Sequence, residues 1–173
     1  MHRLRFLFFL PLFVACEVQE QSADLLFREG EQAAHDMASY PVAEVKLAEF
    51  LEQFPNDPRA EVALQALARV LMNQQKHNEA IARYETLIAR FPQSRYCVQA
   101  QFMIGYIHDQ LGDYEQARVA YQQVIDTYPN SELVDDAKFS IANLGKAPEQ
   151  LLRTKPIDRE CCNDSWTRDS SNQ

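Results

Sequence analysis

Apolar and small residues recur along this chain with a period of 37 residues. Aromatic-proline pairs stand at 54–55, 91–92 and 128–129, so that each pair lies 37 residues from the next. Small residues keep the same register: Ala63, Ala100 and Ala137 each follow a pair's proline by eight residues, and Ala43, Ala80 and Ala117 each precede one by twelve. Self-similarity of this length is the signature of a solenoid, in which each repeat is one supersecondary unit.

Each repeat has the pattern of two helices joined by a tight turn. Apolar positions in 96–111 have helical rather than alternating spacing, and Gly112 then predicts a left-handed stop. Asp113 followed by Gln116 predicts a capping box for a second helix, which Pro129 ends. Asp57, Ser94 and Ser131 are the predicted N-caps of the first helices. Gly105 is the small residue that lets two helices approach closely.

Length, charge and glycine content exclude several classes of protein. The chain has 173 residues, 17 Lys and Arg against 25 Asp and Glu, and a net charge of −8. That is enough for one ordinary domain, and an acidic balance without a basic stripe argues against nucleic acid as a partner. Only four glycines and no apolar run of 18 residues argue against a turn-rich sheet protein and against a spanning helix.

The first fifteen residues predict a signal peptide. Arg3 and Arg5 precede an apolar run over 6–15, which is too short to span a bilayer. Val14-Ala15-Cys16 resembles the cleavage site of bacterial lipoproteins, and the resemblance implies acylation of Cys16, with palmitate among the chains. Glu17, rather than Asp, then implies sorting to the outer membrane. The alternative is an ordinary secretory signal in which Cys16 is incidental.

The repeat resembles the tetratricopeptide repeat. Ile104-Gly105 and His108 match its first helix, 112–117 its turn, and Tyr121 and Pro129 the end of the unit. The resemblance implies an all-α solenoid of about three helix-turn-helix units over 22–145. A short tether over 16–21 precedes it, and a polar tail over 146–173 follows it. Long repeats of this type resemble those of BamD-like outer-membrane assembly lipoproteins and of the periplasmic coordinator of the Tol–Pal system.

Proteins of this class bind partners along a groove lined by their first helices. The resemblance places nine residues in that groove: Gln65, Arg69, Asn73, Phe102, Tyr106, Asp109, Gln110, Phe139 and Asn143. Aromatic side chains there supply contact area, and polar groups fix the register of the partner. The alternative is that Phe102 and Phe139 simply pack the stack.

The sequence offers little for catalysis. No two histidines lie three or four residues apart, and there is neither a nucleophile motif nor a phosphate loop. His77 and His108 fall where the repeat expects packing side chains, and Cys97 is predicted to be a small packing residue. Cys161 and Cys162 in the tail leave pairing with each other, with Cys97 or with another chain open. We therefore expect no enzyme, no metal and no cofactor.

These observations predict a non-enzymatic binding scaffold in envelope or outer-membrane protein assembly. It would be lipid-anchored on the periplasmic face of the outer membrane, and its partner would be a protein or peptide of the cell envelope. One alternative is a periplasmic partner of a Tol–Pal, peptidoglycan or division machine. Another is an enzyme accessory subunit that uses its tail cysteines for redox coupling. The oligomeric state and the identity of the partner do not follow from the sequence.

Overall fold

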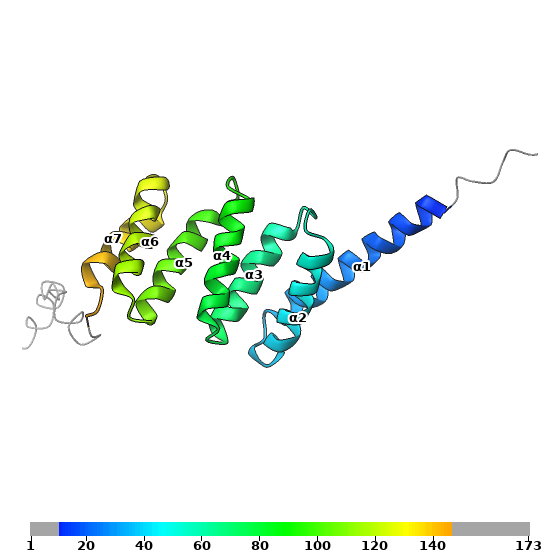
Figure 1. Ribbon diagram of the computed structural model, residues 1–173, viewed down its shortest axis with the longest axis horizontal. Helices are drawn as coiled ribbons and strands as arrows, with labels where there is room; N and C mark the ends of the chain where they lie inside the picture. Colours follow the sequence, from blue (N-terminus) through cyan, green and yellow to red (C-terminus); the bar gives the residue numbers. More distant parts are fainter. Residues whose placement is uncertain (1–10, 147–173) are drawn as a thin grey trace, which may run out of the picture.

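The helices of the chain stack side by side into an elongated array (Figure 1). The computed structural model describes the backbone of residues 11–146 and the side chains of residues 22–146. Over 11–146 the chain forms seven α-helices, one 3₁₀ helix and no strand: α1 (Pro11–Ala33), η1 (Met37–Ser39), α2 (Tyr40–Gln53), α3 (Ala60–Asn73), α4 (His77–Arg90), α5 (Cys97–Gln110), α6 (Tyr114–Thr127) and α7 (Leu133–Asn143). The predicted all-α solenoid is confirmed.

The helices pack in sequence-adjacent pairs. α1 packs against α2, α3 against α4 and α5 against α6, and the second helix of each pair also contacts the first helix of the next. α7 packs on α6 and touches α5. The described part of the chain is therefore three helix pairs followed by a single first helix, as the 37-residue period predicts.

The repeat is visible in the backbone torsions as well as in the sequence. Phe54, Phe91 and Tyr128 end α2, α4 and α6 with φ near −126°, −127° and −125° and ψ near 56°, 60° and 55°. The proline after each of them cannot donate the next helical hydrogen bond, so the chain leaves the helix at the same place in every unit. The same residue pattern thus imposes the same exit three times.

The first helix shares the register of the later ones. Three residues of α1 and the residue that follows it are buried, and each lies 37 positions before a buried residue of α3: Ala23, Leu26, Gly30 and Ala34 precede Ala60, Ala63, Leu67 and Leu71. Gly30 stands where α3 has Leu67. A Cβ on Gly30 would lie 2.8 Å from Leu47 Cγ. A side chain like that of Leu67 has no room at position 30 because Leu47 of α2 fills the space, and the glycine lets the two backbones approach closely.

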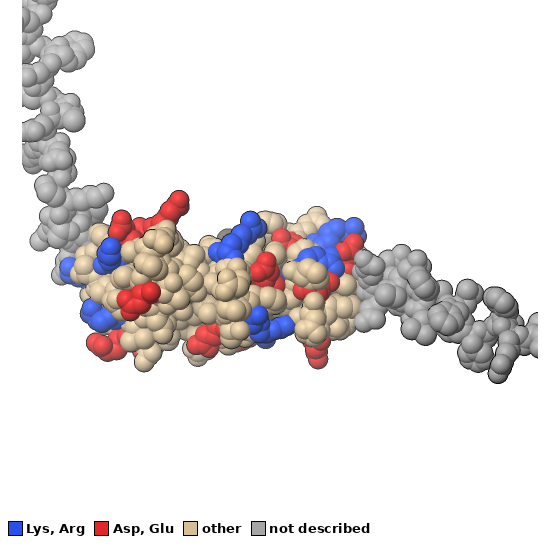
Figure 2. Space-filling model, turned by 90° about the horizontal axis from the view of Figure 1, so that it is seen from above, with Lys and Arg blue, Asp and Glu red and all other residues tan. Residues whose placement is uncertain are grey.

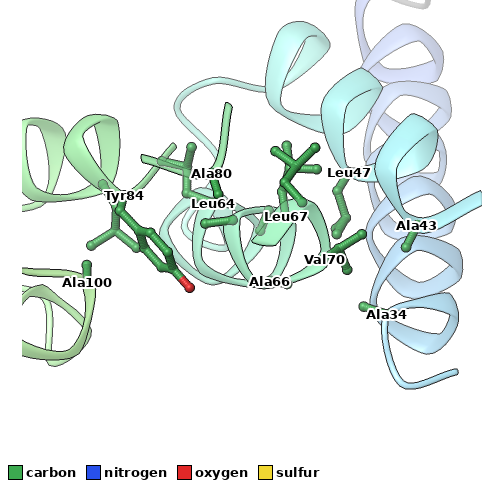
Figure 3. Close-up of a cluster of buried hydrophobic side chains, with 14 of the residues drawn as sticks. Ala34, Ala43, Leu47, Leu64, Ala66, Leu67, Val70, Ala80, Tyr84 and Ala100 are labelled. Carbon is green, nitrogen blue, oxygen red and sulfur yellow. The ribbon is translucent and has the colours of Figure 1, made fainter. Parts of the chain in front are cut away.

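Large residues of the second helices build the core between the pairs. Leu47, Tyr84 and Tyr121 occupy equivalent places and are almost completely buried. Figure 3 shows Tyr84 lying between residues of three helices, with Leu64, Ala80 and Ala100 around it. A Cβ on Gly105 would come within 2.7 Å of the Tyr121 ring, so Gly105 brings α5 against α6 as predicted.

The predicted stop at Gly112 is confirmed, and the predicted capping box is wrong. Gly112 has φ +78°, and Gln75, its equivalent one unit earlier, has φ 62° although it carries a side chain. Asp113 does precede α6, but its side chain caps no backbone N–H of the helix. Its Oδ2 lies 3.8 Å from His108 Nδ1 instead, so the carboxylate is turned toward the end of α5.

The other predicted caps act one turn before the regular helix. The Oδ1 of Asp57, the Oγ of Ser94 and the Oγ of Ser131 each accept the N–H two residues on, at 2.9, 3.2 and 3.2 Å. Helices α3, α5 and α7 begin three, three and two residues after these positions. The side chains thus hold the turn that opens each first helix.

The N-terminal predictions fall mostly outside the described side chains. The backbone of 16–21, predicted as a short tether, is helical and continuous with the rest of α1. Within residues 11–146, no helix combines the length and the hydropathy needed to cross a membrane. Residues 1–10 and 147–173 lie outside the described structure, and so do the predicted tail, Cys161 and Cys162.

Candidate protein-binding face

The nine residues predicted to line a groove all lie on α3, α5 and α7. We call the surface that these residues form the first-helix face. α5 and α7 are in contact, and each is the first helix of its unit. The stacking therefore brings residues 37 positions apart, such as Arg69 and Tyr106, onto neighbouring first helices.

The strongest cluster on this face surrounds the hydroxyl of Tyr121. Tyr121 comes from α6, and its hydroxyl is hydrogen-bonded to Ser140 of α7. Burial raises the pKa of Tyr121 to about 12, and the nearby Asp109 and Tyr106 of α5 raise it too. Residues of three helices thus contribute a carboxylate, two phenols and a hydroxyl to the surroundings of Tyr121.

Two members of this cluster are available to a partner. The ring of Tyr106 is 41% exposed, which is high for a large aromatic side chain. Asp109 is half-buried, and burial raises the pKa of its carboxyl group. A carboxylate in this position is stabilised by a cation that replaces its lost hydration. The pair is suited to a basic side chain that stacks on the phenol and pairs with the acid.

One unit earlier the core tyrosine has a residue of the opposite charge near it. Tyr84 is the equivalent of Tyr121, and burial raises its pKa to about 12 while the positive charge of Arg69 lowers it. Arg69 is half-buried on α3. The first-helix face therefore has a guanidinium beside one core tyrosine and a carboxylate beside the next.

The two phenylalanines predicted for the groove differ in their surroundings. Phe102 is half-buried, and its ring lies 5.1 Å from that of Tyr121, at an angle of 56°. Phe139, its equivalent on α7, is 62% exposed. Phe102 thus contributes to packing within its unit, while Phe139 presents its ring to solvent.

The remaining predicted residues are less suited to capture a partner. Asn73 donates a hydrogen bond to the Tyr40 hydroxyl at 2.9 Å. Asn143 donates to the Phe139 carbonyl at 2.7 Å and accepts from Lys146 Nζ at 3.2 Å, so it serves the end of α7. Gln65 is half-buried and Gln110 is exposed. The structure gathers Tyr106 and Asp109 at one point and leaves these four residues dispersed.

A depression that the sequence does not predict lies where the start of α2 meets the end of α3. It has a volume of about 460 Å³ and is lined by Met37, Tyr40, Pro41, Glu44, Asn73, Gln74 and Lys76. Met37 at its rim is 76% exposed. Lys76 Nζ pairs with Glu44 at 2.6 Å across it. Met37 belongs to η1, which among the described units only the first has, so no repeating pattern could have revealed this depression.

Charge is dispersed over the surface. Figure 2 shows acidic and basic side chains interspersed with wide neutral areas on the face that it presents. Several cations are held in ion pairs, including Lys46 with Glu29 at 2.9 Å and Arg59 with both Asp57 and Asp24. Over residues 22–146 no three side chains of the metal-binding types come together as ligands.

The two histidines of the helical repeats are packing residues, and each has one ring nitrogen without a hydrogen-bond partner. His77 and His108 are half-buried, and the Nδ1 atom of each is buried without a hydrogen-bond partner. Cys97 is buried, and its thiol donates to the Phe91 carbonyl at 3.0 Å. These contacts agree with the packing roles that the sequence predicts.

The comparison with known families agrees with the fold. Residues 66–132 match the family described as tetratricopeptide repeat. The matched segment runs from within α3, through α4, α5 and α6, to the residue before α7. Residues 66–132 are thus similar to tetratricopeptide repeats, and the all-α helical-repeat fold of the described residues fits that class, whose members form scaffolds for binding other proteins.

Proposed function

We propose that the chain is a non-enzymatic, lipid-anchored scaffold on the periplasmic side of the outer membrane. In this role it binds a protein partner in envelope or outer-membrane protein assembly through the first-helix face. The observation that carries the binding site is the cluster of Tyr106 and Asp109 beside the Tyr121 hydroxyl. An exposed phenol next to a half-buried carboxylate has the composition of a recognition site rather than that of a core.

The charges of the face indicate the kind of segment it would bind. Arg69 lies beside Tyr84 and Asp109 beside Tyr121, one repeat apart. A segment crossing both units would place an acidic residue near Arg69 and a basic residue near Asp109. Complementary charges of this kind fix direction and register more than they add affinity.

A photo-crosslinking amino acid at position 106 tests this proposal in intact cells. The matched control is position 119, because Val119 is 52% exposed but lies on the outer side of α6, away from Ala117 and Tyr121. We expect one discrete crosslinked product from position 106 and none of that size from position 119. Equal products from both positions, or none from 106, would contradict the assignment of the binding face.

The lipid anchor is proposed from Val14-Ala15-Cys16 and Glu17. After cleavage Cys16 would be the first residue of the chain, and the backbone from it to Ala33 is one helix. Ala23 is already buried in the stack, so residues 16–22 form an arm of about 10 Å, at about 1.5 Å per residue, between the acyl chains and the stack. More than one acyl chain is needed for stable attachment.

Metabolic labelling with a fatty-acid analogue tests the anchor separately from the binding face. We expect label on the natural chain, and an unprocessed, unlabelled precursor for Cys16→Ala. Normal processing of Cys16→Ala would refute the lipoprotein assignment. The scaffold would then be a soluble periplasmic partner of a Tol–Pal, peptidoglycan or division machine.

A further inference from the structure

One side of α7 is uncovered where the same side of α3 and α5 is covered. In α5 this side carries Gln101, Phe102 and Gly105, which are buried or half-buried under α6. The residues 37 positions later on α7 are all exposed, and we call them the α7 end face: Lys138, Phe139 and Ala142. Among the described residues no second helix follows α7 to cover them.

The contact between α6 and α5 shows what fits such a surface. The Tyr121 ring lies against the Gly105 backbone and 5.1 Å from the Phe102 ring. Gln101 Nε2 donates to the Ala120 carbonyl at 3.2 Å and to Gln123 Oε1 at 2.8 Å. We call the space between Phe102 and Gly105, which the Tyr121 ring fills, the notch. A covering helix therefore needs an aromatic residue that fills the notch, a small residue one turn before it and a hydrogen-bonding residue two positions after it.

The chain's own sequence after Lys146 does not repeat these features. In the 37-residue register Asp158 would replace Tyr121, and Thr154 would replace Ala117. Pro156 would fall in the middle of the helix, at the place of Val119, where a proline strongly disfavours helical structure. The repeat register therefore favours a covering helix from another chain.

The α7 end face also differs in charge from its equivalent on α5. Lys138 stands where α5 has Gln101, and its side chain is 59% exposed. Its present ion pair with Asp135, at 3.3 Å, is a surface pair of small energetic value. An acidic residue at the place of Gln123 would therefore suit Lys138. Ala142 is compatible with a covering helix because Ala68, its equivalent on α3, is completely buried.

We propose that the α7 end face binds an amphipathic helix of a partner protein, seated on α7 as α6 is seated on α5. The partner helix carries a small residue, an aromatic residue four positions later and an acidic residue two positions after that. The aromatic ring fills the notch between Phe139 and Ala142, and the acid pairs with Lys138. The α7 end face shares Phe139 with the first-helix face, but its proposed occupant is a helix packed on α7 rather than a segment that crosses the first helices.

A synthetic peptide with the sequence of α6 provides the probe. It comprises residues 113–128 with Gln123→Glu, a fluorescent label, and a hydrocarbon link between positions 118 and 122, which are exposed in α6. The link is needed because a free helix of this length is only marginally stable in water. Binding to the full mature chain is followed by fluorescence anisotropy.

The expected results are specific to the residues of the α7 end face. Phe139→Ala should weaken binding about tenfold or more, because it removes the aromatic wall of the notch. Lys138→Glu should weaken binding about fivefold, and a second peptide with Gln123→Lys should recover the loss on that variant. Val45→Ala, at an exposed position of α2, is the control and should leave binding unchanged.

Four outcomes would overturn the proposal. Unchanged binding to Phe139→Ala would mean that the peptide displaces α6 instead. If the Gln123→Lys peptide did not recover binding to Lys138→Glu, the proposed pairing of an acidic partner residue with Lys138 would be wrong. Binding only to a chain ended after Lys146 would identify the chain's own tail as the occupant. A dimer of the natural chain that Phe139→Ala dissolves, measured by light scattering, would identify a second copy.

Discussion

Single residues decide how sharply the turns of this stack are made. Gln75 and Gly112 occupy the same place in consecutive units, and both have positive φ. Each turn is closed by the same bond, from Lys76 N–H to the Leu71 carbonyl and from Asp113 N–H to the His108 carbonyl, both at 2.9 Å. The backbone geometry is thus equal, and only glycine adopts it without steric cost.

Gln75→Gly and Gly112→Gln should change the free energy of unfolding in opposite directions. We expect Gln75→Gly to raise the free energy of unfolding by about 0.5–1 kcal/mol, since relief of the left-handed strain exceeds the added entropy of the unfolded chain. Gly112→Gln should lower it by a similar amount. Urea unfolding of both variants measures the difference, and a destabilised Gln75→Gly would show that the side chain of Gln75 has a role of its own.

A second prediction at this scale concerns the pH dependence of Asp57. Hydrogen bonds from the Arg59 side chain lower the pKa of Asp57 below its ordinary value. The carboxylate therefore stabilises the fold above pH about 4, and this contribution is lost as the pH falls through the lowered pKa. Asp57→Asn should cost about 1 kcal/mol or more at pH 7 and progressively less in acid.

Thermal melts from pH 7 to pH 2 check this dependence. The control is Asp126→Asn, because Asp126 is exposed on α6 and its side chain accepts a hydrogen bond from Gln122. A gap between natural chain and Asp57→Asn that stayed constant down to pH 2 would refute the role of the ionised form.

At the scale of the element, the close approach of paired helices depends on a small residue in the first helix. A side chain at Gly105 would enter the Tyr121 ring, whereas its equivalent Ala142 is exposed. We expect Gly105→Leu to lower the free energy of unfolding by about 1–3 kcal/mol through overpacking. Ala142→Leu should change it by less than about 0.5 kcal/mol.

Both variants are compared by chemical denaturation. A neutral Gly105→Leu would mean that the boundaries assigned to the units are wrong. A strongly destabilised Ala142→Leu would mean that the α7 end face is covered in solution by the chain itself.

The helices show how far sequence patterns reach. The 37-residue period predicts every pair and its exit, because proline and a buried aromatic impose local geometry wherever they occur. The side chain of Asp113 departs from the predicted cap, since it is 60% exposed and its carboxylate can be hydrated by water instead of by the backbone of α6. Gly30 matches the repeat only weakly in sequence because its complement, Leu47, lies on another helix. A contact of this kind has no signature within one segment.

At the scale of the whole molecule, stacking turns equivalent residues into a surface with a charge pattern. The sequence predicts which helices form the first-helix face. It does not predict that Tyr106 and Asp109 both lie near Tyr121 while Asn73 and Asn143 form hydrogen bonds within the stack, because those choices depend on side-chain rotamers. Phe102 and Phe139 also share a position yet differ in exposure, because only Phe102 has a described helix packed over it.

The most direct test of the binding face compares Tyr106→Ala, Asp109→Asn and Phe102→Ala in two measurements. One is the melting temperature, and the other is capture, by a chemical crosslinker, of the partner first identified from position 106. We expect Tyr106→Ala and Asp109→Asn to abolish capture and to leave the melting temperature almost unchanged. Phe102→Ala should lower the melting temperature, because its ring packs on Tyr121. Loss of capture by Tyr106→Ala only together with a large fall in melting temperature would contradict the binding face.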